Sequence, residues 1–314
     1  MIRVAAKRRI LLLATLIAAS LAQAALAMVG AYCVRAVFDT ALSRSGANPS
    51  LPTSAIAALL LGSALLACVI EIYRTWAGER LSLGYVAEIR TALFEKIMRA
   101  APAAIANKRQ GGLLLPFVGD LTAIKKWVGN GLVKLISASI MLVVLLAALG
   151  TQSPLLAGVA ASVVLCAAIA LNRLAGPLDA AIRETRAKRG AIANFVSGSI
   201  SAAQTVRAFN RVSRELARLE RRNRAMMSAG LRLAALSGTM AGIVHLASGL
   251  LIAAVLAVGV VETGNGAMSV GLVAGAISIA GLLAAAVRDL GVAFELGRRA
   301  RVSFQKISRA LEIE

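Results

Sequence analysis

Long apolar segments alternate with long basic segments along this chain. The apolar segments lie at about 10–34, 54–73, 132–149, 154–172, 238–261 and 268–288. Most are close to the ~20 residues that a helix needs to cross ~30 Å of hydrocarbon. The second and third are short as purely apolar runs, so their spans include flanking residues. The pattern predicts an all-α integral membrane fold with six transmembrane helices.

Two long segments between the spans, 74–131 and 173–237, are polar but keep helical periodicity. In the second, apolar residues recur at helical spacing while arginines cover the remaining surface: Val206, Phe209, Val212, Leu216, Leu219 and Met226. A helix from Gln204 to about Gly238 would extend ~50 Å from the membrane at 1.5 Å per residue. We therefore expect membrane helices that continue far beyond the bilayer as antiparallel pairs. The helix of the second span should end near Ala100.

Each antiparallel pair needs a turn, and helix-breaking residues indicate where it lies. Pro102 and the stretch Asn107–Gly112 (NKRQGG) interrupt the first pair. The stretch Arg189–Ser199 (RGAIANFVSGS) interrupts the second. Glycine and proline end helices, so we expect a short cross-helix at each tip.

Composition agrees with a membrane protein, and charge sets its orientation. The chain is 59% hydrophobic but only 4% aromatic, with a mean hydropathy of +0.78 and a net charge of +20. With a cytoplasmic N-terminus, 33 of the 35 Lys and Arg residues fall on the cytoplasmic side, and only Arg35 and Arg44 fall outside. This matches the positive-inside rule and places both termini in the cytoplasm. Because the arginines follow this rule and no nucleic-acid module is visible, nucleic acid is not an expected partner.

The first apolar segment admits two interpretations. A basic start, an apolar run and Ala25-Leu26-Ala27 resemble a secretory signal peptide. The apolar run, however, continues to about 25 residues, beyond the ~7–15 of a signal peptide. Its removal would also leave five spans. We expect a retained first membrane helix.

The chain has three cysteines and no visible metal site. Cys33, Cys68 and Cys166 all lie in apolar runs, far from one another and from the single histidine. We expect them to be small buried hydrophobic residues rather than ligands or disulfide partners.

Polar residues inside the spans are few. Gln23 and His245 could face a substrate cavity, because a polar group facing lipid is unfavourable; for His245 a packing role is the alternative. Arg288 and Asp289 are expected at the membrane interface. Trp127 is expected to anchor the start of the third span at that interface.

Four stretches match the motifs of one known family in order and spacing: Ile89–Val128, Ser199–Glu215, Met268–Ser278 and Arg299–Glu312. The first matches at Ile89, Arg90, Leu93, Pro102, Gly112, Leu114 and Asp120, and the second at Val206, Arg207, Ala208, Phe209 and Glu215. Over nearly all of residues 1–314, the chain resembles the transmembrane domain of six-helix ABC exporters. It departs from the second motif at Gly198, Ala202 and Ala203, so the polar contacts of the second tip are expected to differ from those of the family.

The resemblance implies a membrane subunit that forms the translocation pathway of an ATP-driven exporter in the inner membrane. Its expected partners are an ABC nucleotide-binding domain, a second transmembrane domain of the same or another kind, the lipid bilayer and a transported substrate, for which a lipid or amphipathic compound is expected. The chain contains no G-x-x-x-x-G-K-[ST] phosphate loop. ATP and Mg²⁺ are therefore expected on a separate or missing nucleotide-binding domain, and no catalytic residue is expected here. The alternative is an inactive membrane scaffold or regulator that keeps the exporter fold.

In that family the tip helices bind grooves on the ATPase domains. The residues expected to couple the two are Ala101, Pro102, Ile105, Asn107, Gly111, Gly112, Ala193, Asn194, Phe195 and Ser199. Phe195 is the expected anchor, because it is apolar and lies at a predicted exposed bend.

Overall fold

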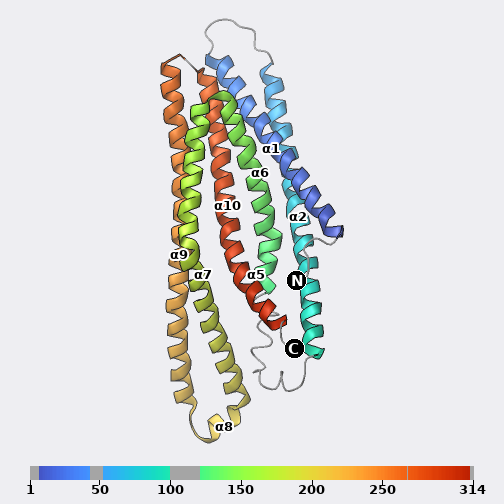
Figure 1. The fold of residues 1–314 in the computed structure, drawn as a ribbon, viewed down its shortest axis with the longest axis vertical. Helices are drawn as coiled ribbons and strands as arrows, with labels where there is room; N and C mark the ends of the chain where they lie inside the picture. Colours follow the sequence, from blue (N-terminus) through green and yellow to red (C-terminus); the bar gives the residue numbers. More distant parts are fainter. Residues whose placement is uncertain (1–6, 43–51, 100–120, 267, 312–314) are drawn as a thin grey trace.

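The computed structural model describes residues 7–42, 52–99, 121–266 and 268–311, and these residues form a bundle of long helices (Figure 1). The long helices are α1 (Lys7–Leu42), α2 (Thr53–Arg99), α6 (Leu132–Gln152), α7 (Pro154–Ser201), α9 (Val212–Gly264) and α10 (Val270–Leu311). Three short elements join them: α5 (Leu121–Lys126), the π-helix η2 (Trp127–Gly131) and α8 (Ala203–Ala208). The described residues contain no strand, so the all-α prediction is confirmed.

Six helical stretches in the described chain are long and apolar enough to cross a membrane, with α5, η2 and α6 counted together. This agrees with the six predicted spans. The first of them, α1, packs against α2, α6 and α10. It is therefore part of the bundle, as a retained membrane helix would be.

Three helices are much longer than a bilayer is thick. α2 has 47 residues, α7 has 48 and α9 has 53, which corresponds to roughly 70–80 Å at 1.5 Å per residue. Since the hydrocarbon core is ~30 Å thick, about 40 Å of each helix lies outside it. We call the parts beyond the apolar segments, 74–99, 173–201 and 212–237, the basic extensions. The expected continuation of the second-span helix towards Ala100 is confirmed as far as Arg99, the last residue described before position 121.

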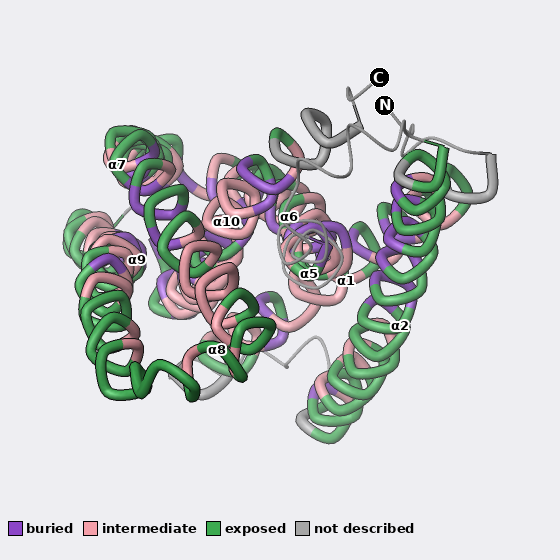
Figure 2. Tube along the Cα trace, turned by 90° about the horizontal axis from the view of Figure 1, so that it is seen from below, coloured by how far each residue is buried: buried purple, intermediate pink, exposed green. Residues whose placement is uncertain are grey.

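The basic extensions lie on two sides of the molecule. In Figure 2, α2 stands on one side and the pair α7 and α9 on the other, with α10, α6, α5 and α1 between them. At the opposite end the helices converge around a core that includes Leu145, Leu251 and Leu283, each fully buried. Leu61, Leu65 and Val69 of α2 point outwards, and each is more than 60% exposed. Lipid would cover such faces in a membrane.

Small residues let the helices approach one another closely. A Cβ atom added at Gly259 of α9 would lie 2.8 Å from Val273 of α10, and one at Gly291 of α10 would lie 2.6 Å from Val244 of α9. Both distances are too short for carbon atoms. Close packing through small residues is typical of membrane helices, which gain little hydrophobic energy by leaving lipid.

Two connections at the converging end are shorter than expected. α1 continues past Arg35 to Leu42, whereas the apolar run predicts an end near residue 34. Ser153 alone joins α6 to α7, and its hydroxyl accepts a hydrogen bond from the Leu156 amide as an N-cap. Hydrophobicity does not report these ends because a helix continues through polar residues until a cap or a turn stops it.

The cysteines only partly match their expected environment. Cys33 is buried, but Cys68 and Cys166 are exposed on apolar segments of α2 and α7. A face covered by lipid is as apolar as one buried in protein, so sequence could not separate the two. Within the described ranges no group of His, Cys, Asp and Glu side chains could hold a metal ion.

Candidate functional site

The tip of the α7–α9 hairpin lies later in the chain than the sequence predicted. Arg189–Ser199 is not a bend, because α7 runs through it without a break and ends at Ser201. The short helix α8 then crosses the tip, and α9 begins at Val212 (Figure 1). The expected unbroken helix from Gln204 is therefore also wrong: its first residues form α8. Gly190 and Gly198 stay helical because tertiary pairing of α7 with α9 outweighs their low helix propensity.

A left-handed residue makes the turn out of α8. Asn210 has φ of 51°. Its amide donates to the Arg207 carbonyl at 2.9 Å, and the Arg211 amide donates to the Val206 carbonyl at 2.9 Å. These two bonds form a Schellman motif, in which a residue with positive φ lets the last carbonyls of a helix find donors. Asparagine is one of the few residues that adopt this conformation readily.

The exposed aromatic residue at this tip is Phe209, whereas Phe195 is only partly exposed. Phe209 follows α8 directly and is 70% exposed, as is Ile200 at the end of α7. Phe195 is only partly exposed, and the Arg222 guanidinium of α9 lies 4.8 Å from its ring centroid. Phe195 thus holds the hairpin together through a cation–π contact. The expectation that Phe195 lies at an exposed bend is wrong, and its role as an anchor stays a prediction.

The other candidate coupling residues are only partly described. Ala193, Asn194 and Ser199 lie on the last turns of α7, each with intermediate exposure and near α8. The candidates of the first tip lie outside the described residues: Ala101, Pro102, Ile105, Asn107, Gly111 and Gly112.

The two polar candidates for a substrate cavity have different surroundings. Gln23 of α1 accepts a hydrogen bond from the Arg74 guanidinium, and Arg74 also pairs with Glu71 at 2.9 Å. The polar group of Gln23 is therefore satisfied by α2. His245 is exposed on α9 in this single chain.

Ion pairs tie α10 to the neighbouring helices. Arg298 of α10 pairs with Asp179 of α7 at 3.1 Å, and both side chains are more than 80% buried. Asp289 pairs with Lys134 of α6 at 2.5 Å. The residue beside it, Arg288, is exposed. These pairs link α10 to helices on both of its sides.

Trp127 packs inside the bundle. Its ring lies against Gly131 of η2 and Gly297 of α10, where an added Cβ would touch it. The ring is partly buried against a core cluster formed by α1, α2 and α5. The structure thus shows a packing contact at this residue, where the sequence led us to expect an interface anchor.

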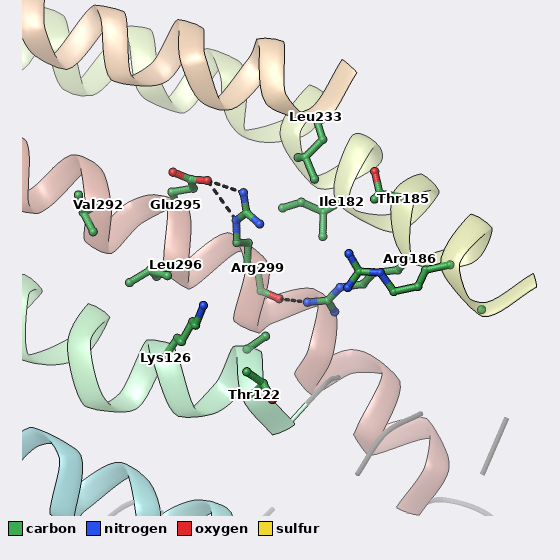
Figure 3. Close-up of a pocket in the computed structure, with 13 residues that line it drawn as sticks. Thr122, Lys126, Ile182, Thr185, Arg186, Leu233, Val292, Glu295, Leu296 and Arg299 are labelled. Atoms are coloured by element: carbon green, nitrogen blue, oxygen red, sulfur yellow. Dashed lines mark hydrogen bonds and ion pairs between the residues drawn. The ribbon is translucent and has the colours of Figure 1, made fainter. Parts of the chain in front are cut away.

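A pocket opens where α7 and α9 diverge from α5 and α10 (Figure 3). It has a volume of about 400 Å³. Four cationic side chains and one carboxylate line it: Lys126, Arg186, Arg189, Arg299 and Glu295. Glu295 and Arg299 pair with each other at 2.7 Å, and Arg186 donates to the Arg299 carbonyl at 2.9 Å.

Sequence reasoning missed the pocket, and it placed the short helix of the second tip at Arg189–Ser199 instead of Ala203–Ala208. The pocket residues come from segments far apart in the chain, so only the packing of α5, α7 and α10 brings them together. For the position of α8 a weak signal was present: Asn210 lies beside the helical stripe, and asparagine favours turns and left-handed conformations. The arginine-rich segments on either side have helical periodicity, so the sequence pattern predicted a continuous helix through Asn210.

Comparison with known proteins agrees with this architecture. Residues 13–287 match the family model of the ABC transporter transmembrane region. A structure described as a bacterial Atm1-family ABC exporter with ATP bound superposes with a TM-score of 0.84 at 16% sequence identity. The match covers 96% of this chain and 53% of that one, so this chain spans about half the length of the exporter chain. No curated protein matches the sequence.

The fold and the family match define a class of protein, the polytopic membrane domains with long helical extensions. Because the family model covers most of its length, the chain belongs to the ABC transporter transmembrane region family. It is a multi-pass integral membrane protein.

Proposed function

We propose that this chain forms the translocation pathway of an ATP-driven exporter by alternating access. ATP hydrolysis would be supplied by a nucleotide-binding domain outside the described residues, and two transmembrane domains would form a dimer around the pathway. The basic extensions would lie in the cytoplasm with both termini, in an inner membrane. The uneven distribution of Lys and Arg supports this orientation.

The observation that carries the proposal is the geometry of the α7–α8–α9 tip. A stiff hairpin projects about 40 Å beyond the bilayer, and a short helix crosses its end. Phe209 beside that helix presents an apolar ring to solvent. An exposed aromatic ring at the end of a rigid lever fits a groove on a partner protein. Such a lever can transmit a motion of the partner to the membrane.

The contact between α7 and α10 supports the assignment of this arrangement to the ATP-bound state. The exporter structure that superposes on this chain is described as having ATP bound. We take the arrangement with the Arg298–Asp179 pair formed as the ATP-bound arrangement of this chain. Without nucleotide, the α7–α9 hairpin would separate from α10 at the level of the basic extensions.

The test is the ATPase activity of the native transporter with Phe209→Glu. A charge at this position would have to be desolvated in an apolar groove, so we expect the membrane domain to stop stimulating ATP hydrolysis, while insertion and folding survive. The matched control is Met227→Glu, because Met227 is 63% exposed on the same hairpin but ~22 Å along α9 from its first residue, Val212. Unchanged ATPase stimulation in Phe209→Glu, or an equal loss in the control, would refute the role of the tip.

The same preparation distinguishes an exporter from an inactive scaffold. An exporter shows vanadate-sensitive ATP hydrolysis that depends on the tip. A scaffold with the same fold would still bind its partners, but their rate of ATP hydrolysis would be the same with Phe209 and with Phe209→Glu.

A further inference from the structure

A second pocket lies between α6, α7 and α10, and we call it the lateral pocket. In Figure 2, α10 lies between α7 and α6. The pocket has a volume of about 390 Å³, which is within the ~300–1,000 Å³ of small-molecule sites. Residues from three helices and from η2 line it, including Trp127, Leu135, Ala168, Leu171, Leu290 and Arg301.

The walls of the lateral pocket are apolar and reach the outer surface of the bundle. Leu135 of α6 is 37% exposed and Ala168 of α7 is also exposed, whereas Leu171 is buried. Beside Ala168, Leu165 and Ile169 are 61% and 52% exposed on the apolar segment of α7. Lipid covers such faces in a membrane, so lipid has access to the pocket from this side.

The charge at the lateral pocket is positive. The guanidinium groups of Arg298 and Arg301 line it, and no carboxylate of the described residues does. Arg298 is neutralised by Asp179 at 3.1 Å. Arg301 is exposed and makes no ion pair with any residue that the structure describes. The pocket therefore has one positive charge without a carboxylate partner in this part of the chain.

The apolar wall and the free charge lie at different depths in the membrane. Leu171 lies ~26 Å along α7 from its first residue, Pro154, and Arg301 lies ~47 Å along α10 from Val270. The hydrocarbon core is ~30 Å thick, and the bilayer with its headgroups is ~40–45 Å thick. Because α10 runs obliquely to the long axis of the molecule (Figure 1), the depth of Arg301 is less than the length along the helix. The apolar wall is thus level with hydrocarbon, and Arg301 is level with headgroups.

We propose that the lateral pocket binds an anionic phospholipid of the leaflet on the side of the basic extensions. One acyl chain lies against Leu135, Ala168 and Leu171, and the phosphate accepts hydrogen bonds from the Arg301 guanidinium. Basic pockets between membrane helices are known to bind anionic headgroups. The proposal requires only that the chain spans a membrane, so it is independent of the exporter mechanism.

A lipid in this pocket braces α7 against α10. Residues of both helices line the pocket, so the lipid makes all of its contacts only while the two helices are together. A ligand stabilises the state that binds it. Bound lipid therefore favours the arrangement in which Arg298 and Asp179 are paired.

The test measures contact between lipid and Trp127 in bilayers. Trp76→Phe leaves Trp127 as the single tryptophan of the full chain. This chain is reconstituted in phosphatidylcholine with dibrominated phosphatidylglycerol or dibrominated phosphatidylcholine, because bromine on an acyl chain quenches tryptophan fluorescence on contact. We expect a binding constant about fivefold higher for phosphatidylglycerol, which is the factor that one arginine contributes near an anionic surface.

Charge removal in the pocket should abolish the preference for the anionic lipid. Arg301→Gln should lower the ratio of the two binding constants from about fivefold to about one. The side chain is exposed, so the variant should fold, which gel filtration checks. The matched control is Arg288→Gln, which removes an exposed charge from the same helix outside the pocket and should leave the ratio unchanged.

Filling the pocket should exclude the acyl chain. Ala168→Phe places a large side chain at an exposed position that lines the pocket, so quenching by both brominated lipids should fall. The matched control is Ala161→Phe, at an exposed position of α7 outside the pocket, which should keep the quenching.

Four results would overturn the proposal. These are equal binding constants for the two lipids in the single-tryptophan chain, a ratio unchanged by Arg301→Gln, quenching unchanged by Ala168→Phe, and no quenching by either lipid. The last would mean that protein rather than lipid covers the pocket. The assay needs no ATPase, so its failure leaves the exporter proposal standing, and a failure of ATPase coupling leaves the lipid result standing.

Discussion

At the residue scale, one backbone conformation decides where the second tip turns. Asn210 adopts a positive φ, and the hydrogen bonds of Arg207 and Val206 depend on it. The sequence marks this position only weakly, because the flanking residues keep a helical stripe. A glycine there would have made the turn visible from sequence alone.

Asn210→Val should therefore destabilise the tip locally. A β-branched residue in a left-handed conformation costs of order 1–3 kcal/mol. We expect faster amide hydrogen exchange at Arg211 with no change in the thermal midpoint of the bundle. Asn210→Gly is the control and should keep wild-type exchange. Equal protection in the Val and Gly variants would show that the Schellman motif does not hold the turn.

Gly131 illustrates a second constraint at this scale. A methyl group at this position would overlap the Trp127 ring inside η2. The glycine is thus required by packing rather than by its backbone angles.

Gly131→Ala should lower thermal stability in detergent by about 1–3 kcal/mol, despite the better helix propensity of alanine. Adding Trp127→Leu should restore much of the loss, because it removes the overlapping ring. Gly158→Ala on α7 is the matched control, since an added Cβ there meets nothing within 4 Å. A loss at Gly158 as large as that at Gly131 would argue against the packing explanation.

At the element scale, α7 and α10 are joined by one well-buried ion pair. Arg298 and Asp179 are 18% and 13% exposed, and the Arg298 guanidinium also lies 5.0 Å from the Phe294 ring centroid. Breaking a buried pair leaves a charge without a partner, which is more costly than replacing both residues by apolar ones.

We expect Arg298→Met to destabilise the chain by about 3–5 kcal/mol and Asp179→Leu to rescue most of that loss in the double variant. Thermal unfolding of the two single variants and the double variant in nanodiscs gives the coupling energy. A coupling energy near zero would mean that this ion pair does not hold α7 and α10 together.

The helical elements themselves were largely predictable, because hydrophobic length reports membrane spans directly. The run of α2 to Arg99 followed from helical periodicity without a proline. The position of α8 did not, since Arg189–Ser199 contains glycines and yet remains helical. The packing of α7 against α9 keeps Arg189–Ser199 helical. The local sequence does not reveal this tertiary contact.

At the scale of the whole molecule, the six spans, the basic extensions and the family could be predicted from the sequence. The site could be predicted only in part. Phe195 was chosen for its chemistry, but its ring faces Arg222 across the hairpin. The basic pocket depends on helix packing over more than 170 residues of chain, from Lys126 to Arg299. Spacing within one segment cannot reveal it.

The central claim is that the α7–α9 hairpin moves relative to α10 when ATP binds. Two exposed positions, Arg183 of α7 and Arg301 of α10, can be changed to cysteine and spin-labelled, with Cys33, Cys68 and Cys166 replaced by alanine. The distance between the labels is then measured in the native transporter, diluted with unlabelled protein. The account predicts a shorter distance with ATP and vanadate than without nucleotide, and no change in Phe209→Glu. The same distance in both conditions would contradict it.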